Sequence, residues 1–268
     1  MIRAINLIRL FLRWQQLNKM KKNKRLRELD FLRGLAVILV LFRHTNVHPF
    51  LQNMGWIGVD LFFVLSGYLV SNLLFKEYQK FGNINPTRFL IRRGFKIYPL
   101  YYFTLIFYII LNWKNLDSLS LLGDLTFIQN YVGWGWGYLY GASWSLAVEE
   151  HFYFGLALTF WLMLKTKYFE TFILPSSKRV EIICISIFIS CLTLRVFSNY
   201  YFPELETSRN FTATHLRIDS LLAGVLLSYW INFKLLLFSK FMKKHHIYIL
   251  LLIPFLLAWT PFVEPLSS

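Results

Sequence analysis

The segment Leu32–Asn46, LRGLAVILVLFRHTN, has the composition of a membrane helix but carries charged side chains near both ends. Arg33 lies close to its start, and Arg43 and His44 lie close to its end. Charges inside a bilayer are costly and usually mark function. Eleven helical steps separate Arg33 from His44 by roughly 16 Å along the axis and about 20° around it, so one helix face carries both side chains.

The rest of the chain is equally apolar. Of its 268 residues, 56% are hydrophobic and only 16% are charged, which is too little polar surface for a soluble domain of this length. We therefore predict an all-α fold: a polytopic integral membrane helical bundle of about seven transmembrane helices. The predicted spans are residues 31–48, 56–75, 94–112, 143–164, 181–198, 215–233 and 246–263.

The net charge of +15 is distributed along the chain in a regular way. Lys and Arg are abundant before the first predicted span and in every second connection, and scarce in the connections between. This alternation follows the positive-inside rule and predicts a cytoplasmic N-terminus, whereas a nucleic-acid partner would need the charge on one soluble face. Residues 1–28 are expected to form a basic cytoplasmic segment, either an interfacial helix on the membrane surface or a plain basic leader, and residues 29–268 the membrane domain, with lipids as partners.

Orientation converts sequence position into depth in the bilayer. Four ionisable residues on four spans are predicted at similar depth toward the outside: His44, Asp60, Glu149 and Arg217. Four arginines are predicted at the inner face: Arg33, Arg88, Arg92 and Arg93. A buried carboxylate needs a partner, so the outer group predicts a functional site, although Arg92 and Arg93 taken alone would be ordinary inner-face anchors.

Other chemistries fit the residues less well. His44 and His48 have the i, i+4 spacing of zinc ligands, but no H-E-x-x-H motif is present and Pro49 follows, so no metal is expected. Cys184 and Cys191 lie about 10.5 Å apart on one predicted helix, too far for a disulfide. The apolar piece Leu119–Tyr131 is too weak for a span and is expected to be re-entrant or interfacial.

Five segments in order carry a resemblance to a known family. They are RELDFLRGLAVILVLFRH, GWIGVDLFFVLSGYLV, RFLIRRGFKIYPLYY, SWSLAVEEHFYF and HLRIDSLLAGVLL, and they extend from Arg27 to Leu227. In these elements the chain resembles the membrane-bound acyltransferases of type 3. The resemblance implies transfer of an acyl group, with acetyl expected, from cytoplasmic acyl-CoA to a hydroxyl of a cell-surface or exported carbohydrate or glycolipid. It also implies the inner membrane of a bacterium and no bound cofactor.

The resemblance carries over residue by residue. The family's Arg and His pair corresponds to Arg33 and His44, and its acidic residues correspond to Asp60 and Glu149. Two features depart from the family pattern: His151 stands where glutamine is more usual, and about seven spans are predicted where the family has about ten. A truncated, inactive member is therefore an alternative reading.

The expected mechanism places His44 as general base on the acceptor hydroxyl, because imidazole titrates near neutral pH. Asp60 or Glu149 would orient His44, and direct transfer and an acyl-enzyme on His44 both stay open. The expected acyl-CoA-binding residues are Arg33, Arg88, Arg92 and Arg93, and the acceptor-site candidates are Glu150, Arg217, Asp219 and Trp144. A glycan or lipid-intermediate transporter or flippase is the alternative from another class.

Overall fold

The computed structural model describes residues 27–45, 48–132, 143–166, 178–201 and 212–259. Within these ranges the chain forms eight α-helices, one short 3₁₀ helix and no strand, which confirms the all-α prediction. The basic N-terminal segment up to residue 26 lies outside the described residues. The helices are α2 (Arg27–Arg43), α3 (Pro49–Phe81), α4 (Pro86–Leu111), η1 (Trp113–Asn115), α5 (Ser118–Thr126), α6 (Trp144–Lys165), α8 (Arg179–Tyr201), α10 (Thr214–Phe233) and α11 (Leu235–Trp259).

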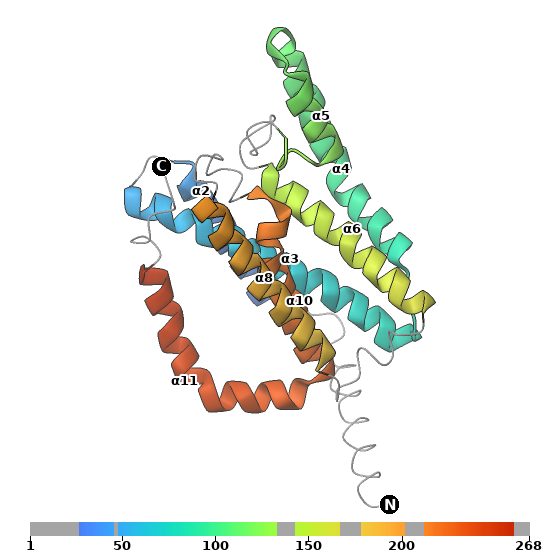
Figure 1. Cartoon of the computed structure of the whole chain (residues 1–268), viewed down its shortest axis with the longest axis vertical. Coiled ribbons are helices and arrows are strands. Elements are labelled where there is room, and N and C mark those ends of the chain that lie inside the picture. Colours follow the sequence, from blue (N-terminus) through green and yellow to red (C-terminus); the bar gives the residue numbers. More distant parts are fainter. Residues whose placement is uncertain (1–26, 46–47, 133–142, 167–177, 202–211, 260–268) are drawn as a thin grey trace, which may run out of the picture.

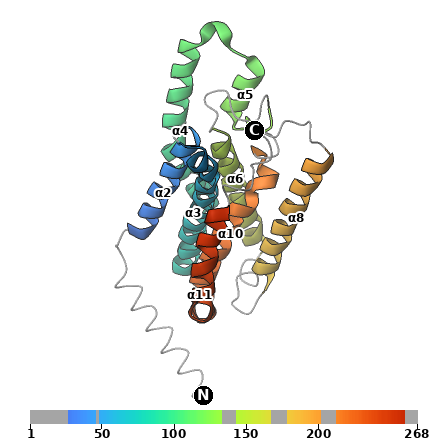
Figure 2. The same ribbon diagram turned by 90° about the vertical axis from the view of Figure 1, so that its left-hand side faces the viewer.

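Helix α3 runs through the middle of the bundle and packs against α2, α6 and α10 (Figures 1 and 2). It is 33 residues long, about 50 Å at the usual helical rise. His48 caps its first turn, where the ring Nδ1 accepts a hydrogen bond from the Phe50 amide at 3.2 Å. Gly82 ends the helix in the left-handed conformation, with φ of 66°, which a residue with a side chain rarely adopts.

The closest approach in the bundle lies between α3 and α10. A Cβ atom at Gly67 would fall 2.0 Å from the carbonyl oxygen of Leu221. Reciprocally, a Cβ atom at Gly224 would fall 2.1 Å from the carbonyl oxygen of Val64. Each helix therefore uses a glycine to admit the backbone of the other, as small residues do where membrane helices pack closely.

Helix α2 packs closely against the first turns of α3, and glycines again make this contact possible. A Cβ atom at Gly55 would lie 2.4 Å from the Cβ of Arg43, and one at Gly58 would lie 2.7 Å from the carbonyl oxygen of Ala36. The end of α2 that carries Arg43 is thus seated on α3, and His44 follows it directly.

Helices α4, α5 and α6 form the other side of the bundle. Helix α4 packs on α6, and the nine-residue α5 folds back along α4 (Figure 2). The Tyr101 hydroxyl on α4 donates to the backbone carbonyl of Asp124 on α5 at 2.9 Å. Asp117 caps α5: the side chain and amide of Ser120 hold the pKa of this carboxyl below its usual range. The piece Leu119–Tyr131 is thus no span, as expected.

The prediction of seven spans is not confirmed. Among the described residues, three helices are long and apolar enough to cross a membrane: Pro49–Phe81, Pro86–Leu111 and Arg179–Ser198. Helix α2 has only 17 residues, and α6 carries Glu149, Glu150 and His151, so both fall short by length or composition.

The structure also differs from the prediction in the last two spans. Helices α10 and α11 meet at Lys234 and are bent by 112° to one another, and they pass the same test only as a pair (Figure 1). Helix α11 starts at Leu235, eleven residues before the predicted span that begins at residue 246. Cys184 and Cys191 lie on α8 with buried, free thiols, as expected from their spacing.

Replacing Gly67 with leucine should separate α3 from α10. The added side chain would meet backbone rather than a flexible neighbour, so the cost should reach or exceed the ~1–3 kcal/mol typical of overpacking. The measurement is the yield of monodisperse protein and its thermal unfolding in detergent. Gly155→Ala is the matched control, because a Cβ there meets nothing within 4 Å. Equal stability of both variants would contradict the packing argument.

Candidate active site

A cavity of about 480 Å³ lies between α2, α3 and the start of α6. His44, which follows α2, is exposed and lines this cavity together with Arg43. Trp56 and Gln52 on α3, and Trp144 and Ser145 on α6, form the facing wall, and aliphatic and phenylalanine side chains complete it. An exposed imidazole on a cavity of this size can meet the hydroxyl of a bound molecule.

Aromatic and cationic groups form a continuous row through this cavity wall. The Arg43 guanidinium lies over the Trp56 ring, 5.1 Å from its centroid. The centroids of Trp56 and Trp144 are 6.3 Å apart, and the rings are tilted by 45°. The Arg217 guanidinium lies 5.9 Å from the Trp144 centroid on the other side. Cation–π contacts of this kind link α2, α3, α6 and α10.

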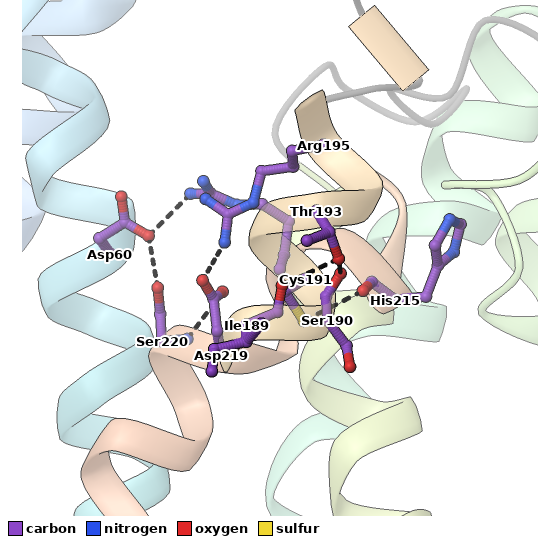
Figure 3. Close-up of polar contacts among 10 residues, drawn as sticks. Asp60, Ile189, Ser190, Cys191, Thr193, Arg195, His215, Asp219 and Ser220 are labelled. Carbon is purple, nitrogen blue, oxygen red and sulfur yellow. Dashed lines mark hydrogen bonds and ion pairs between the residues drawn. The ribbon is translucent and has the colours of Figure 1, made fainter. Parts of the chain in front are cut away.

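The row ends in a network of two acids and two arginines. Arg217 Nη2 donates to Asp60 Oδ1 at 2.8 Å, and the Ser220 hydroxyl donates to the same oxygen at 2.8 Å. Arg195 on α8 pairs with Asp219 on α10 (Figure 3). The two arginines stand close enough to interact electrostatically. Three helices, α3, α8 and α10, are thus joined by charged pairs.

A second acidic group lies deeper, on α6. Glu149 and Glu150 are both buried. Glu149 is in hydrogen-bonding contact with Ser66 and Tyr153 and in the electrostatic field of Arg93 and Arg33. Glu150 Oε2 accepts from the Tyr98 hydroxyl at 2.8 Å.

Arg93 is the cation that faces this acidic pair. Its guanidinium lies over the Tyr153 ring, 4.3 Å from the centroid, and donates to the Tyr153 hydroxyl. Within the described part of the chain, one oxygen of Glu149 and one of Glu150 have no hydrogen-bond partner, nor does Arg93 Nε. Hydrogen-bonding capacity is therefore left over at the centre of this cluster.

The structure sorts the predicted inner-face arginines into two kinds. Arg93 and Arg33 turn toward the buried carboxylates, whereas Arg88 and Arg92 are exposed on α4. Arg33 lies in the second turn of α2, and His44 directly follows the last residue of that helix. Among the contacts of the described residues, neither Asp60 nor Glu149 is linked to His44: Asp60 is bonded to Arg217, and Glu149 to Ser66 and Tyr153.

The sequence reading missed several residues of these clusters. Arg195 pairs with Asp219, and it could have been found because it is an ionisable residue inside an apolar run. Trp56, Ser66 and Tyr153 carry no such signal. His151, the departure from the family pattern, contacts the Thr214 hydroxyl through Nδ1 at 2.7 Å, and Asn130 donates to that hydroxyl at 2.8 Å.

No group of three or more potential metal ligands of the His, Cys, Asp or Glu type occurs among the described residues. The arrangement therefore consists of an imidazole on a cavity, an aromatic wall flanked by arginines, and a deeper carboxylate–arginine cluster. Such a set can position a hydroxyl, accept its proton and bind anionic groups.

Comparison with known proteins agrees with this description. The sequence profile of the type 3 acyltransferase family, described as an acyltransferase domain, matches residues 26–264, and the chain belongs to this family. The chain is 31% identical over 242 residues to the O-acetyltransferase OatA of Staphylococcus aureus strain NCTC 8325, covering 83% of this chain and 38% of OatA.

A second relative, named "Putative O-acetyltransferase", comes from Staphylococcus aureus strain COL. It is 32% identical over 233 residues, which are 81% of this chain and 37% of that protein. The chain thus spans less than two fifths of the length of these relatives. No solved structure matches it significantly.

The Asp60–Arg217 pair should show energetic coupling. Asp60→Asn, Arg217→Gln and the double variant form a double-mutant cycle, read out by thermal unfolding in detergent. Because the Asp60 side chain is 42% exposed, solvent screens the pair, and we expect a coupling of only about 1 kcal/mol. Additivity of the two single changes within about 0.3 kcal/mol would show that the pair contributes nothing.

Proposed function

We propose that this chain is an O-acyltransferase domain that moves an acyl group, expected to be acetyl, from cytoplasmic acyl-CoA to a hydroxyl of a cell-surface or exported carbohydrate. The observation that carries the proposal is the position of His44, which lines a ligand-sized cavity at one end of α2 while Arg33 lies toward the other end. Membership of the acyltransferase family and the O-acetyltransferase names of two relatives support the reaction class.

The proposed orientation follows from the loop charges. The N-terminus lies in the cytoplasm of a bacterial cell, and the bundle crosses the inner membrane. The proposed seven spans are the three helices that are long and apolar enough to cross, α3, α4 and α8, the three helices that pack against them, α2, α6 and α10, and α11. In this frame Arg33 faces the cytoplasmic donor and His44 the acceptor.

His44 acts as general base in the proposed reaction. Its imidazole takes the proton of the acceptor hydroxyl as the oxygen attacks the thioester carbonyl. The carbon–sulfur bond breaks, the CoA thiolate leaves, and the imidazolium returns the proton to it. An acyl-enzyme on His44 would give the same products in two steps, and both routes stay open.

The carboxylates take different parts in this proposal. Asp60 orients Arg217, whose guanidinium lies beside Trp144. It does not orient the imidazole of His44, because its contacts lead to Arg217. Glu149 and Glu150 hold Arg93, and with it Arg33, in position for the anionic part of the donor. Arg88 and Arg92 are exposed on the same helix as Arg93 and add positive charge along the donor's approach.

Replacing His44 with alanine should lower the acyl-transfer rate by roughly 10²–10⁴-fold, the usual contribution of a general base. The assay follows acetyl ester on the surface glycans of cells expressing the chain, and label transfer from acetyl-CoA by purified protein in nanodiscs. His246→Ala, an exposed histidine on α11, is the matched control. Glycan movement across the membrane without ester formation would instead support a transporter, and full transfer by His44→Ala would overturn the assignment.

Arg33→Ala should weaken the binding of acetyl-CoA with little change in protein yield, because a phosphate contact would be lost at the surface of α2. Arg33→Lys should retain part of the affinity, since the charge remains but the bidentate fork does not. Equilibrium titration of acetyl-CoA against the purified variants measures both. Unchanged affinity in Arg33→Ala would count against the donor-binding role.

A further inference from the structure

The cavity beside His44 has a lining that proton transfer and donor binding do not explain. Its volume of about 480 Å³ lies in the range of small-molecule sites, and an acetyl group would fill only a small part of it. Arg43, Trp56 and Gln52 line it and have no part in the chemistry proposed for His44. The residues point to a second bound group that shares the cavity with the imidazole.

We propose that this cavity binds a sugar ring that carries a negative charge, with Trp56 and Trp144 as its stacking surface and Arg43 as its anion contact. The inference rests on the proposed function, because the bound sugar is the acceptor of the acyl group. It narrows the acceptor to an acidic carbohydrate and assigns two binding residues, Trp56 and Arg43.

The aromatic wall suits a sugar. Trp144 is buried and held by its contacts with Trp56 and Phe63, whose ring is edge-on at a centroid distance of 6.0 Å. Trp56 is only partly buried and reaches the cavity itself. Indole rings offer an apolar face beside a polar group, as the alternating C–H and hydroxyl groups of a pyranose require. Gln52 and Ser145 add polar side chains to the same wall.

The charged side chains that line the cavity favour an anionic ligand. Among the described residues that line the cavity, the ionisable ones are Arg43 and His44, and no carboxylate is present. The ion pairs of the described residues lie elsewhere, on Asp60, Glu181 and Asp219. The guanidinium carbon of Arg43 lies over the Trp56 ring, 5.1 Å from its centroid. A guanidinium can donate two N–H groups to a carboxylate or phosphate.

A lipid tail is a poorer occupant of the same space. The aliphatic side chains of Val37 and Val40 would accept it, but Arg43, His44 and Gln52 would then face hydrocarbon. Burying charged and polar groups against an apolar ligand is costly. An acidic sugar has apolar C–H groups for the aliphatic and aromatic side chains of the lining, and polar and charged groups for Arg43, His44 and Gln52.

The test measures binding of two matched probes to the full chain in nanodiscs by isothermal titration. The probes are an oligosaccharide of galacturonic acid and the same oligosaccharide with its carboxyl groups reduced to alcohols. The unmodified chain should bind the acidic probe about tenfold or more tightly, a typical effect of one charge-assisted contact. Arg43→Gln should abolish this preference without weakening the reduced probe, and Arg43→Lys should keep part of it.

The tryptophan variants separate stacking from charge. Trp56→Leu should weaken both probes by roughly tenfold, and Trp56→Phe by less, because a smaller ring remains. Trp161→Leu and Lys80→Gln are the controls, since each removes one partner of an exposed cation–π pair outside the cavity, Trp161 with Lys165 and Lys80 with Phe81. Both controls should bind as the unmodified chain does.

The results keep the inference apart from the proposed function. If the Trp56 and Arg43 variants bind both probes as before, the inference is overturned, even where acyl transfer proceeds normally. Tighter binding of a phospholipid or an alkyl chain than of either probe, lost in Trp56→Leu, overturns it in favour of a lipid site. If binding changes as expected while no acyl transfer occurs in the unmodified chain, the sugar site stands and the enzymatic proposal fails.

Discussion

The bundle depends on one contact, the meeting of α3 and α10 backbone to backbone at Gly67 and Gly224. No side chain fits between Gly67 and the carbonyl of Leu221, or between Gly224 and the carbonyl of Val64. Because the register of the two helices is fixed there, Asp60 on α3 comes within 2.8 Å of Arg217 and Ser220 on α10. The same helix receives α2 at Gly55 and Gly58, which places Arg43 and His44 on the cavity.

Charged groups inside the bundle occur in two clusters with different surroundings. The cluster of Asp60, Arg217, Asp219 and Arg195 consists of direct ion pairs between side chains that, apart from the buried Arg217, are only partly buried. The cluster around Glu149 is held by hydroxyl groups and by a guanidinium stacked on a tyrosine, and it keeps unpartnered oxygens. Among the described residues, the first cluster also keeps atoms without a hydrogen-bond partner, Nε of Arg195 and Nε of Arg217, so the two clusters differ in their direct ion pairs rather than in spare hydrogen-bonding capacity.

Much of this arrangement could be predicted from composition and spacing. Long apolar runs require helices in a membrane, and eleven helical steps separate Arg33 from His44 by about three turns along α2 and its C-terminal end. The partners of Asp60 and Glu149 could not be predicted, because the loop charges give only an approximate depth and say nothing of the rotation of a helix about its axis; Glu149 lies deeper than predicted, near Arg93 and Arg33. That rotation turns Asp60 to Arg217, and it separates Arg93, which faces Glu149, from its exposed neighbour Arg92. The predicted number of spans is not confirmed for a related reason: α10 and α11 are apolar enough to cross only as a pair, and the 112° bend between them at Lys234 has no apolar signature.

The network of Asp60, Arg217, Asp219 and Arg195 holds two positive and two negative side chains, so its formal charges sum to zero. A membrane potential acts on a net charge with about 2.3 kcal/mol per elementary charge per 100 mV when the charge traverses the whole field. A neutral quartet feels almost none of that force, while loss of any one member leaves a single charge exposed to it. The same four side chains therefore join the helices and keep the network insensitive to the membrane potential. Substitutions among them in related chains should come in compensating pairs.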